Sequence, residues 1–468
     1  MTDKEQFEAL SYKRRNAYEV MSDSEISEMN ALCNEYRCFL DAGKTERECV
    51  RESVKLAEEY GFKNLDGTES LKPGDRVYKI NRGKNILLAV IGSDDITSGI
   101  NLVGAHIDSP RLDLKQNPLY ESCDMALLKT HYYGGIKKYQ WTAIPLAMHG
   151  VVYTESGETV ELNIGENEDD PVFCVTDLLP HLAQDQMSKK MSEGIEGENL
   201  NILIAGMPVK AKDVSEKVKF AVLKYINEKY GMKERDFQTA EIEIVPAFKA
   251  KNVGFDGSFI GAYGQDDRVC GFTTLKSILD TKSPKKTAMA ILVDKEEIGS
   301  MGNTGMQSAF FSMAVAEVIE KLTGSCTVTQ YNKTIANSAC MSSDVNAGVD
   351  PNYESVSEKK NASFCNCGVV LTKYTGARGK SGSSDASAEF VSSLARIMDA
   401  NGVVWQTGEL GKVDQGGGGT IAQYVANLNM EVIDCGVSVL SMHSPFEITA
   451  KTDVYMAYRA YMAFYKDR

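Results

Sequence analysis

Hydrophobic and polar residues near the start of the chain recur with helical spacing. Ser22 with Glu25, and Thr45 with Glu48, each show the spacing of a capping box, which marks a helix N-terminus. Apolar side chains then recur every three or four positions through residues 22–62. We therefore predict two amphipathic helices in this region, with a role in packing.

The pattern changes to short β-type runs after residue 75. Residues 76–92 are apolar and β-branched on both sides of a turn at 82–85, and the run NLVGAHID follows at 101–108. Strand ends are where α/β sheets place their chemistry, so His106 is a candidate functional residue.

The middle of the chain has a different texture. VVYTESGETVELNIG, at 151–165, alternates like half-exposed antiparallel strands, and a polar stretch follows at 184–200. We predict an α/β catalytic domain built from residues 1–111 and 246–468, with a mixed sheet flanked by helices. A β-rich domain at 112–245 is inserted into it.

The strand, loop and helix pattern returns after Ala247. Asp266 and Asp267 precede an apolar helical face, and AMAILVDKEE is a short buried strand that ends in acids. MQSAFFSMAVAEVIEKL, at 306–322, predicts a helix. IDCGVSVLSMHSPFE, at 433–447, predicts a strand that ends in a histidine. Polar residues thus recur at strand ends on both sides of the insertion.

Composition and charge narrow the class of protein. The 468 residues carry a formal net charge of -14, which disfavours binding to nucleic acid or anionic membranes. No stretch has the apolar length of a signal sequence or membrane span. The eleven cysteines are scattered and form no C-x-x-C pair, which favours reduced thiols. We expect a cytoplasmic protein that acts on a small or peptidic substrate.

Five segments combine His, Asp or Glu with Gly or Ser in positions that suit a cleft. They lie around His106, Asp266, Glu296, Asp344 and His443. Buried carboxylates need a positive partner, and few arginines lie nearby in sequence. Imidazole and carboxylate ligands without thiolates suit zinc, with manganese or cobalt as alternatives, and the excess of acids suits two ions. Taken alone, His106 and His443 are more typical of structural histidines than of metal ligands. The acids taken alone also fit a helix N-terminus at Asp266, a solvated strand end at Glu296 and a turn at Asp344.

Together these motifs resemble a known family. GAHIDSPRLDLK, GQDDRVCGF, DKEEIGS, SSDVNAG and MHSPFEI are similar, in this order, to the aspartyl aminopeptidase and vacuolar aminopeptidase I family of dinuclear zinc peptidases. The likeness extends over nearly the whole chain. It implies a metallo-aminopeptidase, an inserted domain that mediates dimer contacts or forms a lid, and a homo-oligomer, a dodecamer built from dimers.

The resemblance also implies a ligand set. Asp266 would bridge two divalent ions, one of them also held by His106 and Asp344 and the other by Glu297 and His443. These ligands come from segments that lie far apart in sequence.

The remaining roles follow from the same resemblance. Glu296 matches the general base, which would accept a proton from a water that bridges the metals, so that the resulting hydroxide attacks the substrate carbonyl. Asp108 would orient the His106 imidazole, and the peptide bond between Asp266 and Asp267 is expected to be cis.

Two further residues are candidates for substrate or inter-subunit contacts. His181 matches a histidine that the family places near the active site of a neighbouring subunit, although its segment also fits a surface helix. Lys373 lies in a basic, glycine-containing loop that suits an acidic group or solvent equally. Asp350 stands where acid-preferring members carry a histidine, so acidic and neutral first residues both stay open. His149 is expected to be structural.

Three other function classes stay open at this point, one of them a self-assembling cargo protein, although nothing in the sequence resembles a propeptide. A metal-dependent deacylase or carboxypeptidase can use the same pair of ions, and only an aminopeptidase requires a free α-amine. A non-catalytic scaffold protein is the second alternative, and the complete ligand set beside Glu296 argues against it.

Overall fold

The main body of the protein is organised around a nine-stranded mixed sheet. The computed structural model describes residues 1–376 and 378–468. Within these residues the strands of the central sheet lie in the order β1 (Lys63–Asn64), β2 (Arg76–Asn81), β3 (Asn85–Val90), β13 (Thr287–Val293), β4 (Ile100–His106), β14 (Ala339–Ser342), β18 (Glu431–Gly436), β16 (Val369–Thr372) and β17 (Trp405–Thr407). Strands β13, β4, β14 and β18 run parallel, so their carboxyl ends share one edge.

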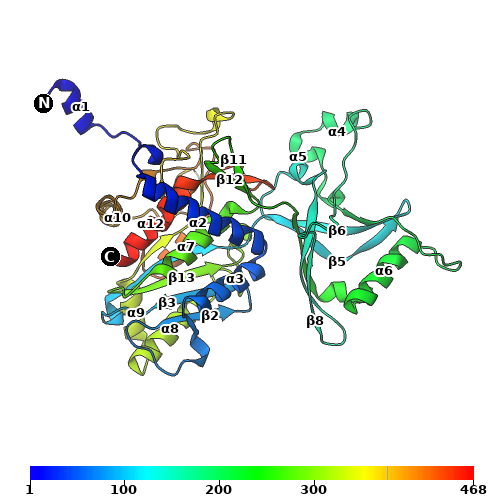
Figure 1. The fold of residues 1–468 in the computed structure, drawn as a ribbon, viewed down its shortest axis with the longest axis horizontal. Helices are drawn as coiled ribbons and strands as arrows, with labels where there is room; N and C mark the ends of the chain where they lie inside the picture. Colours follow the sequence, from blue (N-terminus) through cyan, green and yellow to red (C-terminus); the bar gives the residue numbers. More distant parts are fainter. Residues whose placement is uncertain (377) are drawn as a thin grey trace.

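Helices cover both faces of this sheet, which confirms the predicted α/β architecture (Figure 1). Neighbouring side chains along a strand enter different cores: Leu88 packs on one face and Leu87 on the other. The first face is covered by α2 (Asp23–Ala42), α3 (Glu46–Glu59), α7 (Gln265–Asp280), α10 (Ala388–Ala400) and α12 (Lys451–Asp467). The second is covered by α8 (Phe310–Thr323), α9 (Val328–Ala336) and α11 (Ala422–Ala426).

The two N-terminal helices begin where the capping signals predict. The Ser22 and Thr45 side chains accept the backbone N–H of Glu25 and Glu48, and each glutamate returns a bond to its cap residue. The reciprocal bonds satisfy donors that a helix N-terminus otherwise leaves unpaired. Both helices are therefore fixed by local sequence as well as by packing.

Residues 111–246 form a separate lobe beside the body (Figure 1). Its antiparallel sheet has the order β8 (Thr159–Ile164), β7 (Leu146–Tyr153), β10 (Ala240–Pro246), β5 (Arg111–Ser122), β6 (Met125–Tyr133) and β9 (Ile202–Ala205). Its helices are α4 (Gln184–Ser188), α5 (Met191–Gly194) and α6 (Lys217–Tyr230). A core of its own includes Trp141 and Ile244. The chain enters the lobe directly after β4 and returns through β10.

A small third sheet lies next to the candidate site, and here the structure differs from the sequence prediction. It has the order β11 (Lys251–Val253), β12 (Phe259–Ala262), β20 (Glu447–Ala450), β19 (Ser438–Leu440) and β15 (Asn346–Ala347). Residues 433–447 therefore belong to two sheets rather than one strand. A Cβ on Gly436 would lie 1.8 Å from the Asp344 carbonyl oxygen, so the chain passes too close to Asp344 for any side chain there. His443 consequently lies in the turn between β19 and β20.

The N-terminal helix α1 (Asp3–Leu10) projects away from the body and buries none of its residues (Figure 1). Among the described residues, every helix is too short or too polar to traverse a lipid bilayer.

Candidate metal centre

The candidate side chains meet at the carboxyl edge of the nine-stranded sheet. β4 ends at His106, which is in register with Val293 at the end of β13. Glu296 and Glu297 follow β13 in a short 3-10 turn, and Asp344 follows β14. Since these three strands are parallel, their ends bring the polar residues to one place.

Two groups of potential metal ligands share one carboxylate. Ligand atoms of His106, Asp266, Asp267 and Asp344 all lie within 4.8 Å of one another, as do those of Asp266, Glu297 and His443. Asp266 thus belongs to both groups. Its Oδ1 lies 3.2 Å from His106 Nε2, and its Oδ2 lies 3.0 Å from His443 Nε2.

Several carboxylate oxygens of the two ligand groups are buried without a hydrogen-bond partner, so they are available to bind a cation. Both carboxylate oxygens of Asp267 and Oε1 of Glu297 are unpaired. Burial raises the pKa of Asp267, Glu297 and Asp344 well above their ordinary values, because little solvent stabilises the charged forms. Divalent ions would satisfy these acids, so the donor set fits a metal centre.

Asp267 is a donor that the sequence prediction did not include. It lies next to Asp266 at the start of α7, where both residues have non-helical backbone angles and the peptide bond between them is cis, as expected. The two adjacent aspartates of the GQDDR motif are the sequence feature that could have identified Asp267 as a further ligand.

Asp108 connects the segment that carries His106 with the segment that carries Glu296 and Glu297. Its backbone carbonyl oxygen lies 3.0 Å from His106 Nδ1, and its Oδ1 lies 3.2 Å from the same nitrogen. Its carboxylate also accepts the backbone N–H groups of Glu296 at 3.1 Å and Glu297 at 3.2 Å, and the Tyr133 hydroxyl at 2.8 Å. Asp108 therefore orients the imidazole and both glutamates without offering a free oxygen.

Glu296 lies beside the first group and lines the adjoining cavity. Its Oε2 is 3.8 Å from His106 Nε2, and its side chain is 17% exposed. Burial raises the pKa of Glu296 to about 7, with the nearby carboxylates of Asp108 and Asp266 acting in the same direction. A carboxyl group with a pKa near neutrality can both accept and release a proton.

Two further contacts hold His443 in place, and sequence reasoning missed both. Glu447 accepts the backbone N–H of Asp266 at 3.0 Å and that of His443 at 2.6 Å. His443 Nδ1 lies 2.8 Å from the backbone carbonyl oxygen of Gly135, which belongs to the lobe. Glu447 stands inside the MHSPFEI motif, but only the fold shows that its carboxylate spans two segments.

A cavity of about 420 Å³ opens over the ligand groups. Its acidic wall is formed by Asp266, Glu296, Glu297 and Asp344, and Gly417, Gly418 and Gly419 bring bare backbone to another side. Its remaining lining includes Asn346, Thr372, Leu410, Gln423, Tyr424 and Met442. Among the described residues that line it, none is lysine or arginine. The cavity is thus suited to a substrate with positive charge near the acids.

His181 and Lys373 do not reach this cavity within the single chain. His181 is exposed in the lobe, in the connection that precedes α4. Lys373 forms an ion pair with Asp385 at 2.5 Å and faces a separate cavity with Tyr374 and Glu409.

Paired groups of histidine and carboxylate ligands at the carboxyl edge of an α/β sheet define a metal-dependent hydrolase. The protein-family model described as "Aminopeptidase I zinc metalloprotease (M18)" matches residues 39–465 of this chain. The chain belongs to this M18 family of zinc metalloproteases and is a metallo-aminopeptidase.

Individual relatives agree with this assignment. The chain is 51% identical over 454 residues to "Probable M18 family aminopeptidase 1" of Clostridium acetobutylicum, which covers 96% of this chain and 97% of the relative. The crystal structure of an M18 aminopeptidase from Thermotoga maritima has a TM-score of 0.94 at 44% identity, covering 98% of this chain and 100% of that one. The S. cerevisiae mApe1 dodecamer has a TM-score of 0.76 at 20% identity, covering 94% and 97%, and shares the fold.

Proposed function

We propose that this aminopeptidase uses two divalent ions, with zinc as the native metal, and that Glu296 is the general base. The observation that carries the proposal is the sharing of Asp266 between two ligand groups, with Glu296 directly beside them. Asp266 would bridge the ions, His106 and Asp344 would complete one site, and Glu297 and His443 the other. Asp267 belongs to the first group as an additional donor.

The bound ions would act as Lewis acids that polarise the scissile carbonyl and acidify water. Glu296 accepts a proton from the attacking water and returns it to the departing amine. Asp108 keeps His106 and the backbone of Glu296 in place during this exchange, because it bonds to both. The glycine backbone at 417–419 lets the peptide chain approach closely.

The acidic wall would also recognise the substrate's free α-amine, which is how an exopeptidase selects the first residue. Since the described lining has no lysine or arginine, we expect uncharged first residues to be preferred over Asp and Glu. Lys373, the sequence candidate for an acidic substrate group, is already paired with Asp385.

We also propose that residues 112–245 form an inserted dimerisation domain and that dimers assemble into a dodecamer. The apolar side chains exposed on the lobe, such as Leu178, Leu182 and Met187, support an interface between copies. The dodecameric yeast neighbour supports the larger assembly. In such an assembly His181 would lie at a subunit interface. All eleven cysteines are free, which supports action in the reducing cytoplasm.

A panel of aminoacyl chromogenic substrates tests this function after chelation and addition of zinc, manganese or cobalt. Activity should vanish on chelation and return best with zinc. N-acetylated versions of the same substrates should resist hydrolysis. Preference for the acetylated forms would instead indicate a deacylase, and inactivity on the whole panel with metal bound would indicate a non-catalytic protein.

A further inference from the structure

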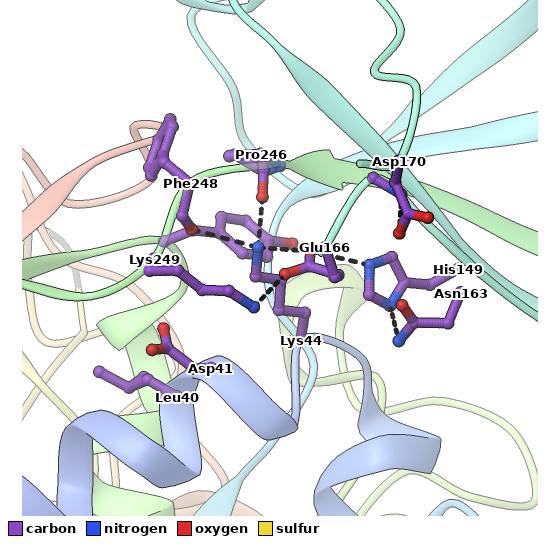
Figure 2. A network of polar contacts seen from close by, with 12 residues as sticks. Leu40, Asp41, Lys44, His149, Asn163, Glu166, Asp170, Pro246, Phe248 and Lys249 are labelled. Carbon is purple, nitrogen blue, oxygen red and sulfur yellow. Dashed lines mark hydrogen bonds and ion pairs between the residues drawn. The ribbon is translucent and has the colours of Figure 1, made fainter. Parts of the chain in front are cut away.

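Four buried charged side chains connect the lobe to the body far from the metal ligands in sequence. Lys44 and Glu48 belong to the body, where they flank the start of α3, and His149 and Glu166 belong to the lobe. Lys44 Nζ donates to Glu166 Oε1 at 2.6 Å, and His149 Nε2 lies 3.1 Å from the same oxygen (Figure 2). On its other side, His149 Nδ1 lies 2.8 Å from Glu48 Oε1. We call these four residues the interlobe clamp.

The clamp also binds the segment through which the chain leaves the lobe. Lys44 Nζ donates to the backbone carbonyl oxygens of Pro246 at 2.7 Å and Phe248 at 3.2 Å, and Lys249 pairs with Glu166 at 2.7 Å (Figure 2). The Lys44 and Glu166 side chains are 3% and 8% exposed. Because removal of one partner from a buried ion pair leaves the other unpaired, such contacts resist displacement more than surface pairs do.

Strand pairing connects the clamp to the metal centre. His149 on β7 is in register with Glu243 on β10, Glu243 with Asp113 on β5, and Asp113 with His131 on β6. Two residues beyond His131, Tyr133 reaches Asp108, and the Gly135 carbonyl reaches His443. One continuous row across the lobe sheet therefore runs from the clamp to His131, which lies two residues before Tyr133 and four before Gly135.

We propose that the interlobe clamp holds the lobe in the orientation in which Tyr133 and Gly135 position Asp108 and His443. Lys44, Glu48, His149 and Glu166 are then positioning residues for the reaction, since none of them lines the cavity or belongs to a ligand group. The groups that face His149 are Glu48, Asn163 and Glu166, with Arg51 3.8 Å from Glu48 and with Lys44 and Lys249 bound to Glu166.

Hydrogen exchange in the full-length, metal-depleted chain tests the clamp independently of catalysis. Lys44→Met should speed exchange several-fold in residues 132–136 and at the backbone N–H groups of Glu296, Glu297 and His443. Exchange within β13 and α12 should stay at the wild-type rate. Lys249→Met removes the more exposed partner of Glu166 and should shift the same amides to a smaller extent, which keeps the test informative if Lys44→Met misfolds.

Lys115→Met is the matched control, because Lys115 pairs with the exposed Glu198 within the lobe. With zinc added, Lys44→Met should also bind the metal about tenfold more weakly and recover much of its kcat at saturating zinc. Unchanged exchange at 132–136 in both Lys44→Met and Lys249→Met, or equally faster exchange in β13, would overturn the proposal. A wild-type chain without peptidase activity would instead contradict the proposed function and leave this exchange result unaffected.

Discussion

The Glu447 carboxylate accepts the backbone N–H of His443 at 2.6 Å and, through its second oxygen, the backbone N–H of Asp266. One buried acid thus fixes the spacing of two residues that are 177 positions apart and belong to the same ligand group. Burial raises the pKa of Glu447 to about 8, and the two N–H groups oppose that rise by stabilising the charged form.

Glu447→Gln is expected to weaken metal binding by about 10- to 100-fold, the usual range for residues that hold ligands in place. The reason is that an amide cannot accept both N–H groups, since its NH₂ faces one of them. Titration with a competing zinc chelator measures the change. Recovery of most of the kcat at saturating zinc would identify Glu447 as a positioning residue, whereas unchanged affinity would contradict this role.

Glu296→Gln is expected to lower kcat by about 10²- to 10⁴-fold while metal content stays at the wild-type level. The amide keeps the shape of the side chain but cannot take a proton from water. Steady-state kinetics with parallel metal analysis tests this. Glu354→Gln is the control, because Glu354 is an exposed partner of Lys359. A variant with the wild-type rate would exclude Glu296 as the base.

The number of metal ions bound per chain should distinguish Asp266, which both ligand groups share, from the other ligands. Asp266→Asn is expected to lose both ions after dialysis, because Asp266 contributes to both groups. His443→Gln and Asp344→Asn should each lose mainly one ion. Elemental analysis per chain gives the count, and thermal melting should show a lower Tm wherever metal is lost, since bound metal stabilises the folded state. Retention of two ions by Asp266→Asn would rule out a bridging role.

Isosteric substrates should reveal the charge preference of the cavity. No described residue of the cavity lining is lysine or arginine, so an acidic first side chain would lose hydration without gaining an ion pair to a side chain, which costs roughly 1–3 kcal/mol, or on the order of tenfold. Peptides that begin with Gln and Asn should therefore have kcat/KM at least tenfold above those that begin with Glu and Asp. Leu and Met should also be accepted. Faster cleavage of the acidic members of each pair would contradict the predicted preference.

The clamp should make stability depend on pH through His149. Burial lowers the pKa of His149, but its bonds to Glu166 and Glu48 outweigh this effect and raise it above the ordinary value. A raised folded-state pKa contributes stability below about pH 6.5, and this contribution is lost as pH rises through the folded-state pKa. It amounts to roughly 1.4 kcal/mol for each unit of elevation.

Chemical denaturation of wild type and His149→Gln at several pH values tests this dependence. The free energy of unfolding of the wild type should exceed that of the variant most at pH 6 and less as pH rises to 9. A His131→Gln variant, which changes an exposed histidine, should show no such trend. A difference between wild type and His149→Gln that grows with pH would show that His149 is buried in its neutral form.

Local signals predicted the helix starts and the strand that carries the acids. The capping boxes at Ser22 and Thr45 form as expected, and AMAIL forms the buried strand β13 because its apolar run suits a strand covered on both faces. These features depend on neighbouring residues in the chain, so sequence alone is sufficient for them.

Features that depend on chain crossings could not be predicted in this way. The division of residues 433–447 between two sheets follows from the close passage of Gly436 past Asp344, which lies 92 positions earlier. Likewise, the contact of Gly135 with His443 involves a backbone carbonyl, and every residue type carries one. The ligand motifs were recognisable from the sequence, whereas Glu447, Asp267 and the lobe contacts required the fold.

The Gly135 carbonyl and the Tyr133 hydroxyl make the lobe a structural part of the metal centre. An engineered enzyme reduced to the body would keep all the acidic and imidazole groups of the metal centre. It would lose the lobe residues that orient two of them, Asp108 and His443. Miniaturisation of this scaffold must therefore retain the β5–β6 hairpin, or graft equivalent donors and acceptors in its place. Swapping lobes between relatives is a safer route to altered assembly, provided that the open end of the hairpin, where Tyr133 and Gly135 lie, keeps its geometry.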